Sequence, residues 1–325
     1  MSDFFDKIKS PFTKAEKIFR RMKKARKAKK DICVQIELAK KLDGYITDFL
    51  NGNIERFVPI PKKPELIGKK IIWQYWHQGI NENTPKIVLS CLDSVKKYRG
   101  EYEIIILTEK TLNDYVDFPC FIWEKLGKNG FKLPKLANLI RLYLLCAYGG
   151  VWLDSTIFLT NPIDESMLQK DFFAFQRSQA PPGDAKLFNQ FDPLYFSWDP
   201  RFQVRMLNSF MIAGPNNKIC GNLLSILLEY WKREELAGHY FFKQICFNRM
   251  VLNNEWKNLN CTIISDTDCH KFLTIAFQKF DKRIYDEIAA KSVIHKLSIN
   301  YGKRKIPAGS FFGILINENV KKAKV

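Results

Sequence analysis

Two patterns of apolar residues alternate along the middle of the chain. Short apolar runs, typical of buried strands, occupy residues 70–76, 103–107 and 151–153. Between them, apolar residues recur every three or four positions over 85–98 and 134–147, which is typical of the buried face of a helix. Strand, helix, strand, helix, strand is the order of a parallel sheet. The pattern therefore predicts an α/β fold with a central, mostly parallel sheet.

The first part of the chain shows a helical pattern only. Residues 1–30 read as a basic amphipathic helix, and residues 32–50 read as a second helix with one apolar face. Three prolines within 59–64 form a stiff connector, which indicates a domain boundary. The expected organisation is a basic amphipathic helical extension at 1–60, a catalytic domain at 68–300 and a basic C-terminal tail at 301–325.

The later part of the chain predicts further strands and helices, with a long loop between them. Strands are expected at 171–176, 208–214 and 292–297, and helices at 218–232 and 240–252. The end of the 208–214 strand should face the same cleft as the central strands. In the loop, Tyr195, Phe196 and Trp198 are residues that stack on sugar rings, or that anchor a loop to the core.

Charge is concentrated at one end of the chain. The protein has 325 residues, 46% of them hydrophobic, and a formal net charge of +18. Residues 1–30 hold 12 basic and 3 acidic residues, which is half of that net charge. A helix of this kind favours an anionic membrane surface. A solvated basic arm and a nucleic-acid contact are the alternatives, and the chain has no known nucleic-acid-reading motif.

Cysteine usage and hydropathy bear on the compartment. The eight cysteines form no C-x-x-C pair, which favours free thiols of a reducing compartment. No apolar run is long enough to span a membrane, and the first ten residues have no apolar core of the signal-peptide kind. We expect a cytoplasmic protein, peripheral on the inner face of the cell membrane.

Candidate chemistry follows the strand at 151–153. Asp154 comes at its C-terminal end, with Ser155 and Thr156 behind it. In the preceding helix Asn138 and Arg141 are three residues apart and share a face. Ligands of open α/β sheets bind at the carboxyl ends of strands, so these residues indicate a metal–diphosphate site. The alternative is that Asp154 caps a turn and Arg141 makes a surface salt bridge.

A second group follows the strand at 70–76. Trp73 and Tyr75 belong to that strand, and His77 and Gln78 come directly after it. Aromatic residues at such a place stack on a nucleobase, or they are core. There is no glycine-rich G-x-G-x-x-G loop, which disfavours a dinucleotide enzyme.

The central stretch resembles the capsular polysaccharide synthesis protein family, itself similar to the glycosyltransferases with a DXD sugar-binding motif (glycosyltransferase family 32). Those families place S-D-x-x-R before G-G-x-[WY]-x-D-x-[DT], and here ANLIR precedes GGVWLDST. The resemblance continues in IIWQYWHQG, SCLDSVKKY and VIHKL, and so covers roughly residues 68–300. It implies a GT-A nucleotide-sugar fold and a glycosyltransferase, generally of the retaining kind.

The resemblance also implies roles for single residues. Asp154 would bind a metal or the ribose, and Arg141 with Asn138 would bind the hydroxyls of the donor sugar. His295 and Lys296 would return to the diphosphate, and His295 would join Asp154 as a metal ligand. The implied donor and nucleotide pocket comprises Trp73, Tyr75, His77, Gln78, Thr156, His295 and Lys296.

Two departures from the family pattern affect these expectations. Thr156 stands where a second carboxylate often binds metal, and a hydroxyl is a weaker ligand for a hard cation. Mn²⁺ or Mg²⁺ is therefore an expected cofactor whose necessity stays open. Asn138 replaces an aspartate, which removes a negative charge near the anomeric carbon. The expected partners are a nucleotide sugar, with a UDP-sugar favoured, and a surface-polysaccharide or lipid-linked glycan acceptor. A non-catalytic scaffold of a capsule assembly machinery and a phosphosugar transferase are the alternatives.

Overall fold

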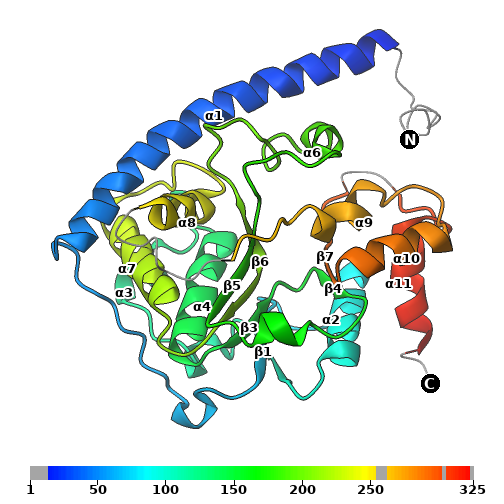
Figure 1. Ribbon diagram of the computed structural model, residues 1–325. Helices are drawn as coiled ribbons and strands as arrows, with labels where there is room; N and C mark the ends of the chain where they lie inside the picture. Colours follow the sequence, from blue (N-terminus) through cyan, green and yellow to red (C-terminus); the bar gives the residue numbers. More distant parts are fainter. Residues whose placement is uncertain (1–13, 254–261, 302–304, 323–325) are drawn as a thin grey trace.

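The computed structural model describes residues 14–253, 262–301 and 305–322. Within them, a five-stranded sheet has the order β2-β1-β3-β6-β5. Its strands are β1 Ile71–Tyr75, β2 Glu103–Leu107, β3 Gly150–Leu153, β5 Phe172–Gln176 and β6 Met206–Ala213. β1 is parallel to β2 and β3, whereas β6 is antiparallel to both of its neighbours. Four strands thus share one direction, which confirms the predicted α/β fold with a mostly parallel central sheet (Figure 1).

Each face of the sheet is covered by a different layer. On β3, Trp152 belongs to one hydrophobic cluster with residues of α4 (Leu133–Ala147), α7 (Lys218–Arg233) and α8 (Phe242–Leu252), which form one layer. Its neighbours Val151 and Leu153 point the other way, toward Val95 of α2 (Lys86–Tyr98). This alternation explains the unbroken apolar run at 151–153, because a strand buried on both faces has no polar side. Burying one such side chain contributes about 1.5–3 kcal/mol.

A second, two-stranded sheet lies on the α2 side. β4 (Ile157–Leu159) pairs antiparallel with β7 (Ile294–Lys296), with Ile157 opposite Lys296 and Phe158 opposite His295. This pairing returns a distant part of the chain to the residues that directly follow β3. The predicted strand at 292–297 is therefore present, and its partner is the segment after the central motif.

The N-terminal helices of the prediction are one helix. α1 (Lys14–Leu50) is continuous through the expected break near residue 31. Its second half packs on the layer formed by α4, α7 and α8, with Leu42 and Ile46 buried. Its first half carries exposed apolar side chains, Phe19 at 69% and Met22 at 52% exposure, and extends past α6 (Ala185–Phe191) in Figure 1. Residues 1–13 of the predicted amphipathic segment lie outside the described residues.

The C-terminal segment is also more than a tail. α11 (Phe311–Lys322) packs against α2, and Phe311 and Phe312 are fully buried in the cluster that they share with α2. The segment expected as a basic tail at 301–325 therefore includes a packed helix, since four buried apolar residues within two helical turns fix it to the domain. The remaining helices are α3 Cys120–Lys125, α5 Glu165–Leu168, α9 Lys271–Thr274, α10 Lys282–Lys291 and the short 3₁₀ turns Pro64–Leu66, Leu112–Asp114 and Asp268–His270. Among the described residues, no helix combines the length and apolar character needed to cross a bilayer.

Two glycines connect α4 to β3 as predicted. Gly149 and Gly150 have φ of 77° and 103°, in the region that favours glycine. A Cβ added to Gly150 would lie 2.5 Å from the carbonyl oxygen of Ile71 on β1. The pair therefore ends the helix and lets β3 enter the sheet directly beside β1, which places Asp154 at the carboxyl edge.

Candidate active site

A cavity of about 520 Å³ opens at the carboxyl ends of β1 and β3. Its walls come from α4, the start of β6, α8 and the residues around β7. The polar residues that line its central part are Asn138, Arg141, Asp154, Thr156, Asn208 and Lys296. The position of this cavity agrees with the edge that strand order alone would select for a ligand.

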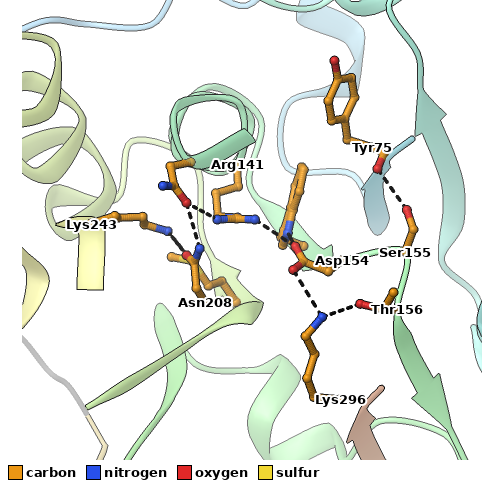
Figure 2. Close-up of polar contacts among 11 residues, drawn as sticks. Tyr75, Arg141, Asp154, Ser155, Thr156, Asn208, Lys243 and Lys296 are labelled. Carbon is orange, nitrogen blue, oxygen red and sulfur yellow. Dashed lines mark hydrogen bonds and ion pairs between the residues drawn. The ribbon is translucent and has the colours of Figure 1, made fainter. Parts of the chain in front are cut away.

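Asp154 is held from two sides by cations (Figure 2). Its Oδ1 accepts hydrogen bonds from Arg141 Nη2 and from the Trp152 indole, both at 2.8 Å. Its Oδ2 lies 3.9 Å from Lys296 Nζ. Burial alone would raise the pKa of the Asp154 carboxyl, but Arg141, Lys296 and the indole lower that pKa to about 2. Asp154 is therefore a permanent anion, and the surface salt bridge considered for Arg141 is instead a cavity-lining pair.

Asn138 joins Arg141 to a chain of hydrogen bonds that runs into the protein. Its Oδ1 accepts from Arg141 Nη1 at 2.6 Å and from Asn208 Nδ2 at 2.8 Å. Asn208 Oδ1 in turn accepts from Lys243 Nζ at 2.5 Å, as Figure 2 shows. Lys243 on α8 is fully buried, and burial lowers its pKa well below the usual range. The amide of Asn138 is thus fixed with its oxygen turned toward two donors.

Asn208 and Lys243 are not predicted by the sequence. The expected edge of the cleft is the far end of the 208–214 strand, whereas β6 runs antiparallel to β3 and presents its beginning. Lys243 gave no signal, because a lysine within a helical run is usually solvated. Lys135 was missed too, although it precedes Asn138 by three residues on the same face; its Nζ donates to backbone oxygens of 239 and 240, and burial lowers its pKa to about 8.

Lys296 and Thr156 contact each other in the lining of the cavity. The β4–β7 pairing places Lys296 beside the end of β3, and its Nζ donates a short hydrogen bond to Thr156 Oγ1. Burial lowers the pKa of Lys296, whereas Asp154 acts to raise it. Both residues line the cavity, so the ammonium group stands between Asp154 and Thr156 at the base of the site.

His295 does not reach the cavity, which corrects the expected diphosphate and metal contact. Adjacent residues of a strand point to opposite faces, so when Lys296 faces the site His295 faces away. Its side chain is fully buried, its ring lies 4.4 Å from that of Phe272, and its Nε2 is 3.3 Å from the Thr160 hydroxyl. Burial lowers the pKa of His295 to about 3, so it is a neutral core histidine.

The candidate residues of β1 and of the turn that follows it differ in whether they reach the cavity. Tyr75 lines the cavity, and its backbone oxygen accepts from Ser155 Oγ at 2.9 Å. Trp73 is fully buried and donates to the carbonyl of Gly149, so its expected donor contact is wrong and it is core. His77 and Gln78 follow in the turn and do not line the cavity; His77 is 2.9 Å from the Tyr75 hydroxyl and 3.5 Å from Glu109.

The aromatic loop encloses a second arginine–aspartate pair. The fully buried side chains of Arg177 and Asp266 pair at 2.8 Å, and the Tyr195 hydroxyl donates to Asp266 at 2.7 Å. The Arg177 guanidinium also lies 4.5 Å from the centre of the Phe196 ring. Tyr195 and Phe196 line the cavity, and both also contact this buried pair, Tyr195 through its hydroxyl and Phe196 through its ring. Asp266 is therefore the buried counterion of Arg177.

The donor set does not resemble a divalent metal site. No group of three His, Cys, Asp or Glu side chains able to hold an ion occurs in the described ranges. Asp154 is the carboxylate beside Thr156, its Oδ1 already accepts two hydrogen bonds, and an ammonium group stands next to its Oδ2. A hard cation needs several oxygen ligands, and here it would meet Lys296 in the same place.

Comparison with known proteins decides the family. The family model described as capsular polysaccharide synthesis protein matches residues 20–315. The chain belongs to this family. The match includes the second half of α1 and the first turns of α11, in agreement with their packing on the domain. It confirms the resemblance read from ANLIR and GGVWLDST.

Two more distant similarities concern glycosyltransferases. This protein is 23% identical over 171 residues to an O-glycosyltransferase, braB of Annulohypoxylon truncatum. The matched part is 50% of this chain and 38% of that protein, so the chain spans well under half the length of this relative. Among solved structures, the PaToxG glycosyltransferase overlaps 74% of this chain and 84% of its own, with 15% identity and a TM-score of 0.32. An overlap this loose does not establish a common fold.

Proposed function

We propose that this protein is a glycosyltransferase of the GT-A type that moves a sugar, of the hexosyl kind, from a nucleotide diphosphate to a glycan. The observation that carries the proposal is the cavity in which two cations share one carboxylate: Arg141 and Lys296 with Asp154. The excess positive charge favours an anionic ligand such as a diphosphate. Family membership and the similarity to an O-glycosyltransferase support the same conclusion.

The cavity gives each part of a nucleotide sugar a partner. Tyr75 and Trp76 line the cavity and are the proposed partners of the base. Asp154 at the centre fits the ribose hydroxyls or the edge of the donor sugar. Asn138 and Arg141 offer amide and guanidinium donors to the sugar hydroxyls, and Lys296 stands where the diphosphate would lie. A UDP-sugar is the favoured sugar donor. Its sugar hydroxyls would face a wall rich in hydrogen-bond donors.

In the proposed reaction the bond from the sugar C1 to the diphosphate oxygen breaks, and its electron pair goes to that oxygen. A bond forms between C1 and the acceptor hydroxyl oxygen, and the hydroxyl proton goes to the departing diphosphate. Cations already in place for the developing charge accelerate such a step, and losing one donor of this kind costs about 10²–10³-fold in rate. Transfer with retention of configuration is part of the proposal.

The acceptor is proposed to be a surface polysaccharide or a lipid-linked glycan, reached at the inner face of an anionic membrane, in a cytoplasmic protein that binds no nucleic acid. The exposed Phe19 and Met22 on the basic half of α1 support this placement. Cosedimentation of the full chain with phosphatidylglycerol vesicles should fall when both are replaced by serine. The control is Ile60→Ser, at an equally exposed residue of the connector, and equal binding of all three proteins would contradict the membrane proposal.

The decisive experiment is a thermal-shift and hydrolysis screen of nucleotide sugars. A donor at a hundred times its dissociation constant should stabilise the protein by about 2.7 kcal/mol. We expect one nucleotide sugar to stabilise the wild type, to be slowly hydrolysed by it, and to give a product whose anomeric configuration is read by NMR. If no nucleotide or nucleotide sugar produces a shift, the proposal fails and a non-catalytic scaffold becomes the better description. Release of a sugar phosphate instead of free sugar would identify a phosphosugar transferase.

A further inference from the structure

The ammonium group of Lys296 occupies the position between the two oxygen-bearing residues of the D-S-T motif. It donates to Thr156 Oγ1 and lies 3.9 Å from Asp154 Oδ2, while its side chain is 23% exposed to the cavity. An ammonium has three donors. One is used by Thr156 and one points toward Asp154, which leaves one for a ligand in the cavity.

The identity of residue 156 fits this arrangement. A carboxylate there would neutralise the lysine and would leave the site with two anions for two cations. The threonine hydroxyl instead accepts from Lys296 without removing its charge. Asp154 is the single carboxylate shared by Arg141 and Lys296, so positive charge is left over for an incoming anion.

A divalent ion at the same place would be poorly held. Its ligands would be one carboxylate oxygen and one neutral hydroxyl, and a hydroxyl is the weaker ligand for a hard cation. The ion would also stand against Lys296, with Arg141 on the other oxygen of Asp154. Like charges this close repel more strongly in a partly buried site than in bulk water.

We propose that Lys296 replaces the divalent metal in this protein, so that its ammonium group contacts the leaving diphosphate and donor binding needs no metal ion. This inference rests on the proposed function, because it assigns the cation of the same site. Lys296 is a catalytic residue in this proposal, and Thr156 is a positioning residue that holds the ammonium group without neutralising it.

The first test measures metal binding by the full chain without any substrate. Mn²⁺ is titrated into the wild type at concentrations below about 1 mM, the range that saturates ordinary protein sites. We expect electron paramagnetic resonance to show no protein-bound ion. Lys296→Ala removes the ammonium group and frees Asp154 and Thr156. A wild type that binds Mn²⁺ at the site, with binding lost in Asp154→Ala, overturns the proposal.

The second test measures diphosphate binding in EDTA. UDP, GDP, CDP, ADP and pyrophosphate serve as probes, since the base is not fixed by the argument. We expect the nucleotide that stabilises the wild type to do so equally in EDTA and in Mn²⁺. Lys296→Ala should weaken that binding about 10–100-fold, and Lys296→Arg should recover part of it because the charge is retained. Lys291→Ala, an exposed lysine at the end of α10, is the matched control and should bind as the wild type does.

The outcomes separate this inference from the proposed function. Binding and transfer that stop in EDTA and return with Mn²⁺ overturn the role of Lys296 and leave the glycosyltransferase intact. Transfer that persists in EDTA but is unchanged in Lys296→Ala also overturns it. If no nucleotide binds under either condition, the proposed function fails and this inference fails with it.

Discussion

One arginine–aspartate pair lines the cavity and a second lies behind aromatic residues of its lining, and the two pairs differ in what is left open. Arg177 and Asp266 are fully buried and surrounded by aromatic rings and backbone oxygens. Arg141 and Asp154 have the same 2.8 Å contact, yet the Asp154 side chain is 26% exposed and has a second cation beside it. The first pair is saturated, so it has nothing to offer a ligand. The second has unused charge facing the cavity, which is what a binding site requires.

Asp154→Asn should separate the two pairs most strongly. The variant keeps the shape of the side chain and removes the charge that orients Arg141 and Lys296. We expect the transfer rate to fall by about 10³-fold or more, with a much smaller change in the melting temperature. Product formation and thermal unfolding of the same preparations measure this, with the exposed Asp286→Asn as control. A variant that retained a tenth of the wild-type rate would place the site elsewhere.

Asp266→Asn should have the opposite effect. Removing one partner of a buried ion pair leaves an uncompensated charge, which costs about 3–5 kcal/mol of stability. Activity per folded molecule should stay near that of the wild type, because Asp266 does not line the cavity. Urea unfolding combined with active-site titration gives both quantities. A stable but inactive protein would show that the second pair also serves the chemistry.

Acid should reduce stability through His270, which lies beside the saturated pair, before it affects the open pair. His270 Nδ1 is 2.8 Å from the Asp266 backbone oxygen, and burial lowers the pKa of His270 to about 4. Between pH 6.5 and 4 the unfolded chain binds a proton here that the folded one does not, so this group reduces stability as the pH falls, by about 2 kcal/mol at pH 5. The Asp154 pKa of about 2 is depressed, so its contribution is present above pH 4 and is lost only as the pH falls toward 2. His295, also buried and neutral, acts in the same direction as His270.

The measurement is the free energy of unfolding from pH 7 to pH 4.5, for wild type and His270→Gln. The variant cannot be protonated, so its stability should change less over this interval, whatever its value at pH 7. Equal slopes for the two proteins would remove His270 from the acid response.

Lys243→Met should give the smallest effect and sharpen the role of the open pair. Methionine fills the same space next to Met211 but cannot donate to Asn208. Stability should be unchanged or slightly higher, since the cost of burying the amino group is removed. We expect kcat to fall about tenfold with little change in KM for the donor, because the amide of Asn138 loses its fixed orientation. Asn208→Ala should reproduce this split, and a change confined to KM would make Lys243 a binding group instead.

The sequence alone determined the part of the site that lies within one short stretch of the chain. The run from Pro134 to Asp154 contains a helix, two glycines and a strand whose geometry follows from neighbouring residues. The side chains of Asn138, Arg141 and Asp154, which this stretch singles out, form hydrogen bonds with one another in the structure. The strand and helix order likewise predicted the sheet. These features depend on periods of two and 3.6 residues, which the chain carries in itself.

Only the tertiary structure decided the other half. The antiparallel direction of β6 selected Asn208, the packing of α8 delivered Lys243, and the β4–β7 register chose Lys296 over His295. A shift of one residue in that register would exchange the two side chains. Pairings over such distances depend on which surfaces bury the most apolar area together, and that sum over the whole fold is not written in any short stretch of sequence.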